Sequence, residues 1–142
     1  MHLLASLLWE QPQSLLGAAN LGLQTLARNV QGAAWRDGRV MVHLRGVGAV
    51  SLGLFVFYSS CDSPWVPVGP ENEQHERGHA VQSRRLGPLY LPLVGVASVT
   101  RVGFAAAHKA LTGRRWAGYY DGWPEREADL LGGVDRALRP AP

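Results

Sequence analysis

The chain has 142 residues, of which 46% are hydrophobic and 18% are charged, and this composition excludes a disordered chain. The net charge of +3 comes from scattered arginines that form no basic stripe, so we expect no nucleic-acid partner. Cys61 is the only cysteine, which excludes an internal disulfide and a cysteine-rich zinc site. We expect a single domain over residues 1–142, with a loose tail at 135–142, in a reducing, cytoplasmic compartment.

The first 30 residues are expected to be helical. The stretch "SLLGAANLGLQTLARNV" has apolar residues at helical spacing, and Pro12 is well placed to begin a helix. The preceding stretch "MHLLASLLWE" is apolar, but it has no basic n-region and no clean cleavage site. We therefore do not interpret it as a targeting segment.

The next 30 residues predict an antiparallel β-meander of three strands. Asp37-Gly38, between two short apolar stretches, is typical of a hairpin turn. Gly46 and Gly48 indicate a second turn before the final strand, which ends near Tyr58. This last strand either offers an edge that can pair with an extended peptide or is buried on both faces.

Three helices are expected after a proline-rich loop, each with residues typical of helix ends. Their expected bounds run from Asn72, as N-cap, to Gly87; from Ser98, as N-cap, to Gly113; and from Pro124 to Gly133. The predicted fold class is therefore α+β, with an N-terminal helical segment, an antiparallel β-meander, a motif-bearing helix and two further helices.

Two apolar runs, at 46–60 and 87–100, bear on membrane association. Each is shorter than the roughly 20 residues that a membrane-spanning helix requires. The simpler interpretation is a core strand and a core helix. The alternative is peripheral contact with a bilayer, favoured by the apolar N-terminus and the arginines.

The stretch "QHERGHAVQSRR" contains His75-Glu76-Arg77-Gly78-His79, a full H-E-x-x-H motif. On a helix the two histidines lie one turn apart on one face and can hold a zinc ion. Glu76 can then act as general base on the metal-bound water, whose pKa zinc lowers to about 7. Gly78 lets another segment approach the helix closely. The alternative is an amphipathic helix with solvated His and Glu.

A third metal ligand is expected in "WPEREADLLGG". Glu125 and Asp129 are four residues apart, so both carboxylates lie on one face of a second helix. Glu125 is the strongest ligand candidate; its alternative role is an acidic residue that interacts with the helix dipole. His108 and Glu127 are the other ligand candidates.

These motifs resemble the gluzincin kind of zincin metallopeptidase, in which H-E-x-x-H supplies two zinc ligands and a downstream E-x-x-A-D supplies the third. The resemblance implies that His75, His79 and Glu125 bind zinc, and that Asp129 accepts a hydrogen bond from a ligand imidazole.

A closer resemblance covers roughly residues 48–134. "HERGHAVQSRRLGPLYLPLVGVAS" and "EREADLLGGV" are similar to a group of small bacterial proteins of unknown substrate, with H-E-x-G-H-x-x-Q-S-x-x-L-G-P-L-Y-L and a later E-x-x-A-D-x-x-G-G. Ala97 stands where that group has proline, and we expect a softer start to the following helix.

Further polar and aromatic residues are candidates for the site. Gln82 can contact substrate or the ligand shell, or it is a buried polar neighbour. Tyr119, Tyr120 and His108 are candidate donors to a tetrahedral oxyanion, although each also suits an ordinary core or surface position. His43 alternates within a strand pattern and needs no metal.

The sequence thus predicts a zinc-dependent metallohydrolase, of the peptidase kind, that acts on a peptide or protein substrate. Its small size means that a second copy, a partner chain or a membrane surface is expected to complete the cleft. The alternative function is a non-catalytic, zinc-stabilised interaction module, peripheral to a membrane. A third is a membrane-associated protein without a metal.

Overall fold

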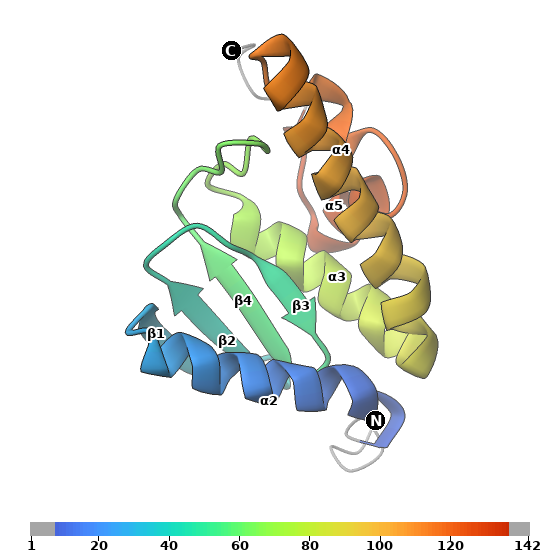
Figure 1. Ribbon diagram of the computed structural model, residues 1–142. Coiled ribbons are helices and arrows are strands. Elements are labelled where there is room, and N and C mark those ends of the chain that lie inside the picture. Colours follow the sequence, from blue (N-terminus) through green and yellow to red (C-terminus); the bar gives the residue numbers. More distant parts are fainter. Residues whose placement is uncertain (1–7, 137–142) are drawn as a thin grey trace.

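The computed structural model describes residues 8–136 and has the predicted α+β class (Figure 1). Residues 1–7 of the apolar N-terminal stretch and residues 137–142 of the expected loose tail lie outside the described part. The helices are α2 (Gln11–Leu26), α3 (Asn72–Leu86), α4 (Val96–Thr112) and α5 (Glu125–Gly132). The strands are β1 (Val30–Arg36), β2 (Arg39–Leu44), β3 (Val50–Leu52) and β4 (Phe55–Ser59). Short helical turns are η1 (Gly87–Leu89), η2 (Leu91–Gly95) and η3 (Ala117–Tyr120).

The predicted first hairpin is confirmed. Strands β1 and β2 pair antiparallel across Asp37 and Gly38, which have φ angles of 52° and 74°. Positive φ at both central residues is the geometry of a type I′ turn, whose twist matches that of the flanking strands.

The predicted meander, however, is wrong. The sheet has four strands in the order β1-β2-β4-β3, and β2 pairs with β4 in parallel, with Val42 opposite Phe57. The apolar run that we expected to form one strand is folded into the β3–β4 hairpin at Gly53, whose φ is 57°. Gly46 and Gly48 therefore belong to a crossover that carries the chain past β4 to the sheet edge.

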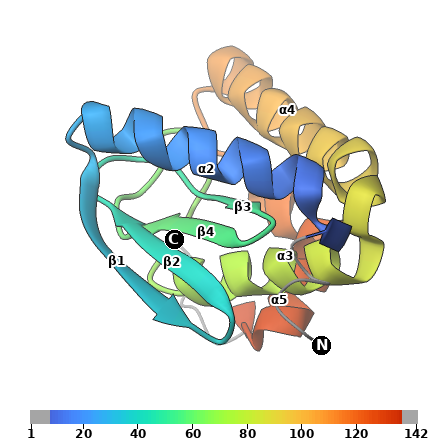
Figure 2. The same cartoon turned by 90° about the horizontal axis from the view of Figure 1, so that it is seen from below.

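The sheet lies between α2 on one face and α3 on the other (Figure 2). Val42 and Phe57 are fully buried and belong to a cluster that also contacts Leu21 of α2. Met41 and Val56 point to the opposite face, where they pack against α3. Successive strand residues alternate between the two faces, so the apolar run of the sequence is needed to bury both of them.

Helices α3 and α5 cross at very short range through two glycines. A Cβ atom on Gly78 would overlap the carbonyl of Ala128, and one on Gly132 would overlap the carbonyl of Gln74. The prediction that Gly78 admits a close neighbour is thus confirmed. Because this neighbour is α5, the crossing places the second motif beside the first.

Three expectations about the helix starts and the second apolar run were wrong. Helix α4 begins at Val96 and not at Ser98, because the chain is already helical through η2, so Ala97 lies within the helix. Asn72 does not cap α3, since its side-chain amide donates to the carbonyl of Ser59. The run at 87–100 is not a core helix, because most of its residues are exposed or half-exposed.

Candidate metal centre

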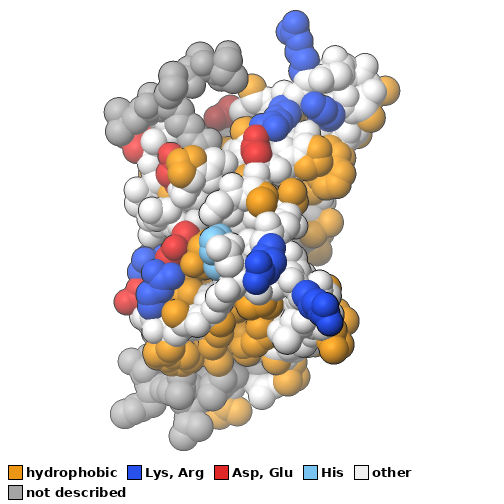
Figure 3. Space-filling view, turned by 90° about the vertical axis from the view of Figure 1, so that its left-hand side faces the viewer, with side chains coloured by type: hydrophobic (Ala, Val, Ile, Leu, Met, Phe, Trp, Pro, Cys, Tyr) orange, Lys and Arg blue, Asp and Glu red, His pale blue; other side chains and the backbone are white. Residues whose placement is uncertain are grey.

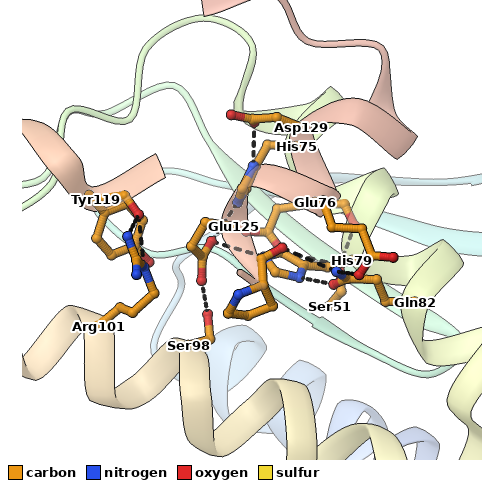
Figure 4. A network of polar contacts seen from close by, with 12 residues as sticks. Ser51, His75, Glu76, His79, Gln82, Ser98, Arg101, Tyr119, Glu125 and Asp129 are labelled. Carbon is orange, nitrogen blue, oxygen red and sulfur yellow. Dashed lines mark hydrogen bonds and ion pairs between the residues drawn. The ribbon is translucent and has the colours of Figure 1, made fainter. Parts of the chain in front are cut away.

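Two imidazoles of α3 converge on one carboxylate of α5 (Figure 4). His75 and His79 are each 5% exposed, and their Nε2 atoms lie 3.0 Å and 3.1 Å from the same Oε2 atom of Glu125. Ligands of a tetrahedral zinc ion, each about 2.0–2.1 Å from the metal, stand about 3.3 Å apart. The three side chains, whose ligand atoms all lie within 4.8 Å of one another, could therefore hold such an ion.

Each histidine is oriented by an acceptor at its other ring nitrogen. His75 Nδ1 lies 2.7 Å from Asp129 Oδ1, and His79 Nδ1 lies 2.7 Å from Gln82 Oε1. A proton on each Nδ1 satisfies these contacts, so the Nε2 atoms, which face a common point, are the ones that would offer lone pairs to a metal ion. This is the arrangement that metal-binding histidines usually require.

Gln82 is fixed in the orientation that serves His79. Its amide nitrogen donates to the carbonyl of Pro124 at 3.1 Å and to Glu127 at 2.8 Å, so its oxygen faces the imidazole. Gln82 is 2% exposed and does not line the cavity described below. The structure thus places Gln82 beside the ligands, as one of its predicted roles requires.

Glu125 is 1% exposed and lies between the imidazoles and α4. Its second carboxylate oxygen, Oε1, accepts a hydrogen bond from the hydroxyl of Ser98. Burial tends to raise the pKa of Glu125, but the hydrogen bonds from His75 and His79 outweigh burial and hold it far below its usual value. Glu125 is therefore ionised, as a metal ligand must be.

Asp129 supports the site from the next turn of α5. It accepts a hydrogen bond from His75 and two from the guanidinium of Arg136, whose Nη2 lies 2.8 Å from Oδ1. Although burial raises its pKa, the bonds to His75 and Arg136 lower it more, so Asp129 is also ionised. The contact between Asp129 and His75 is the one that the gluzincin resemblance implies.

The charges of this region are unbalanced towards the negative. Glu76, Glu125 and Asp129 gather around two imidazoles, and only Arg136 among the described cations contacts any of the three carboxylates. Burial lowers the pKa of His75, but the hydrogen bonds to Asp129 and Glu125 overcome it and raise the value to about 9. His75 thus takes a proton to offset the excess, and a metal cation would replace that proton.

Glu76 is on the cavity side of α3 and does not point at the converging ligand atoms. It is 5% exposed, and its Oε2 atom accepts a hydrogen bond of 3.1 Å from Ser51 of β3. Burial raises the pKa of Glu76 above its usual value, against the opposing effect of His79 and His75. A carboxylate with a raised pKa is suited to accept and return a proton near neutral pH.

A cavity of about 650 Å³ opens beside these residues, between β3 and α4. Among the residues that the structure describes, His75, Glu76, His79 and Glu125 are the only ionisable side chains in its lining apart from tyrosines. The remaining lining is mainly apolar and comes from the β2–β3 crossover, β3, the 63–68 loop, η2 and the start of α4, including Val47, Val50, Trp65, Val66, Leu91, Val96 and Val99.

Tyr119 and Tyr120 both line this cavity, as expected for candidate donors. The ring of Tyr120 packs edge-on against His75, with 5.2 Å between the ring centroids. Burial is the main cause that raises the pKa of both phenols, so both stay protonated and able to donate at neutral pH.

Two candidate ligands lie elsewhere. His108 is on the far half of α4, where its Nδ1 atom is 3.1 Å from the carbonyl of Arg114, so its predicted roles as ligand or oxyanion donor are wrong. Glu127 binds Gln82 and the indole of Trp123, outside the converging ligand atoms. His43 stacks on Tyr58 in the sheet and takes no part in the centre.

The sequence reasoning missed three supporting residues: Ser51, Ser98 and Arg136. Ser98 carried a signal, its place at the expected helix start, but this was interpreted as a cap. The other two carried none, because Ser51 lies in an apolar run and Arg136 in the expected loose tail. Ser51 and Ser98 reach the centre only through contacts between distant segments, whereas Arg136 contacts Asp129 seven residues before it.

Comparison with known proteins gives no relative: no family profile, curated protein or solved structure matches the chain.

Proposed function

We propose that this chain is a zinc-dependent metallohydrolase that cleaves peptide bonds. The observation that carries the proposal is the convergence of the Nε2 atoms of His75 and His79 on one oxygen of Glu125, while Asp129 and Gln82 hold their Nδ1 atoms. Nothing in the packing of an amphipathic helix requires this arrangement. It is the ligand set of the gluzincin resemblance, brought together from two helices.

A zinc ion held by these three residues would polarise a carbonyl and lower the pKa of a coordinated water to about 7. Glu76 is placed to take the proton of the attacking water, since it lines the same cavity as the ligands and its pKa is raised. It would then deliver that proton to the leaving amine. Tyr119, protonated and in the lining, is the donor that we assign to the developing oxyanion.

Strand β3 supports a peptide as the substrate class. It is the last strand of the sheet, and Val50, Ser51 and Leu52 all line the cavity. An extended peptide can add to such an edge through backbone hydrogen bonds, with its side chains in the apolar walls. Because Ser51 also binds Glu76, a peptide on this edge would lie next to the general base.

The test combines zinc content with hydrolysis of a fluorogenic peptide library. We expect near-stoichiometric zinc in the wild type and in Glu76→Gln, and loss of zinc in His79→Ala and Glu125→Ala. Hydrolysis should fall about 10²–10⁴-fold in Glu76→Gln, the usual contribution of general acid–base catalysis. Glu73→Gln is the matched control, because Glu73 lies on the same helix but pairs with Arg36 at the surface.

Three results would contradict the proposal. Zinc retained in Glu125→Ala would show that the third ligand is another residue. Stoichiometric zinc with no hydrolysis of any peptide would instead favour the non-catalytic zinc module. Absence of zinc from the wild type, even after zinc is supplied, would contradict both the metallohydrolase and the zinc-stabilised module.

A further inference from the structure

Helices α2 and α4 expose mainly apolar side chains and no charged ones on their outer sides, which is unusual for helices on the surface of a soluble protein. In α2 the buried residues are Gln13, Ser14 and Gly17. Its exposed side carries Leu15, Leu16, Leu23 and Leu26, which are 63%, 51%, 65% and 84% exposed. The sequence of α2, "QPQSLLGAANLGLQTL", contains no charged residue.

Helix α4 also has an apolar outer side. From Leu91 to Thr112, every exposed position carries an uncharged residue, among them Val99 at 71% and Leu111 at 86% exposure. Two of its polar side chains turn inward beside the buried Ala105: Ser98 binds Glu125, and Arg101 donates to the carbonyl of Tyr119. The 22-residue stretch is long and apolar enough to cross a membrane by length and composition, and only 11% of its most apolar window is buried.

The two helices lie on the same side of the molecule, with the sheet and α5 behind them (Figures 1 and 2). The space-filling view shows hydrophobic side chains gathered along the lower part of another face, while Lys and Arg side chains are spread over several places (Figure 3). Exposed arginines nevertheless follow both apolar helices, with Arg28 after α2 and Arg114 after α4, while the next residue, Arg115, pairs with Asp62. The exposed faces of α2 and α4, here called the apolar face, therefore have cations at their ends.

We infer that the apolar face rests on an anionic lipid surface. The uncharged outer sides of the two helices can enter the region where headgroups meet acyl chains. The arginines at the helix ends can pair with anionic headgroups. Lys109, which is partly exposed near the end of α4, has a stem long enough to reach the headgroups. The inference is independent of the chemistry at the metal centre, because it involves none of the proposed ligands.

The experiment is co-sedimentation of the full chain with phosphatidylcholine vesicles, with and without phosphatidylglycerol. We expect binding that phosphatidylglycerol strengthens and added salt weakens. Leu26→Glu and Leu111→Glu should each reduce binding about tenfold or more, because each places a charge where a leucine would enter the bilayer boundary. Both side chains are more than four-fifths exposed, so folding, checked by circular dichroism, should be unchanged.

Leu130→Glu is the matched control, since Leu130 is 72% exposed but belongs to α5, behind the apolar face. It should bind vesicles as the wild type does. The inference is overturned if the wild type binds neither vesicle, or if the three variants bind alike. It is also overturned if the wild type is a dimer that Leu26→Glu or Leu111→Glu converts to monomer without any lipid binding, because a second copy then covers the face. None of these readouts depends on zinc or hydrolysis.

Discussion

Two buried polar clusters lie along α3, and they differ in the balance of their charges. In the first, Glu10 accepts hydrogen bonds from Arg39 at 3.0 Å and from Ser83 at 2.5 Å, while Arg39 also donates to the carbonyls of Gly53 and Ala80. One carboxylate meets one guanidinium, and both are at most 5% exposed. This cluster is complete without any further ion.

The second cluster is the candidate metal centre, and its charges are not balanced by the residues that surround it. Three carboxylates surround two imidazoles, one guanidinium contacts only the outermost of them, and an open cavity adjoins the group. The comparison teaches that burial of charged residues does not identify a site. A site is indicated by an excess of one charge together with lone pairs that converge.

The largest expected effect comes from a substitution that disrupts the balanced cluster of Glu10 and Arg39. Arg39→Ala leaves Glu10 buried without its cation, and should lower the free energy of unfolding by about 3–5 kcal/mol. Urea denaturation of the zinc-free protein measures this change. Zinc stoichiometry should be unaffected at temperatures where the variant is folded. A loss of zinc from the folded variant would mean that the two clusters are not separate.

The next effect acts on the metal centre through the backbone. Gly78→Ala forces α5 away from α3, because the new Cβ would overlap the carbonyl of Ala128. Overpacking of this kind costs about 1–3 kcal/mol, and zinc affinity should fall with it. Gly22→Ala is the control: Gly22 lies in α2, where an added Cβ would meet no other atom within 4 Å, so alanine there should stabilise by about 0.4–1 kcal/mol. Equal zinc affinity in Gly78→Ala and the wild type would contradict the assigned role of the crossing.

A smaller effect is expected from Asp129, which holds a ligand without being one. Asp129→Asn keeps the shape of the side chain but removes the charge that holds His75, so zinc affinity should fall about 10–100-fold without loss of stoichiometric binding at saturation. Competition with a fluorescent zinc chelator measures this affinity. Asp121→Asn is a suitable control, because Asp121 is exposed and outside the centre. An unchanged affinity in Asp129→Asn would show that Asp129 does not support the ligand.

The last expected effect is the pH dependence of stability in the zinc-free protein. The folded-state pKa of His75 is raised from 6.5 to about 9, so its stabilising contribution is complete below about pH 6.5 and is lost as the pH rises through 9. The pKa values of Glu125 and Asp129 are lowered, so their contributions are present above about pH 4 and are lost as the pH falls. Tm measured with a chelator present should therefore be highest in the mildly acidic range.

With zinc bound, Tm should no longer fall as the pH rises from about 6.5 to 9, because the ion takes the place of the His75 proton. The comparison of Tm with chelator and with zinc between about pH 6.5 and 9 measures the effect. A chelator-treated protein whose Tm is constant over this interval would show that His75 does not carry the compensating charge.

The sequence by itself determined the helical parts of the site. The spacing of His75 and His79, the i and i+4 positions of Glu125 and Asp129, and the close approach at Gly78 are all local consequences of helical geometry or of glycine's missing side chain. The α+β class also followed from local signals, as did the hairpin at Asp37.

Only the tertiary structure decided the strand order, the residues that support the metal centre and the exposed side of each apolar helix. Most of these features depend on contacts between segments far apart in the chain. The sequence had no signal that β4 would enter the sheet between β2 and β3, since a continuous apolar run does not reveal where it folds back. Ser51, Ser98 and Arg136 support the centre across 25, 27 and 7 residues of chain, respectively. Likewise, the apolar composition of α2 and α4 did not say which side would be buried, and packing left many of their leucines and valines exposed.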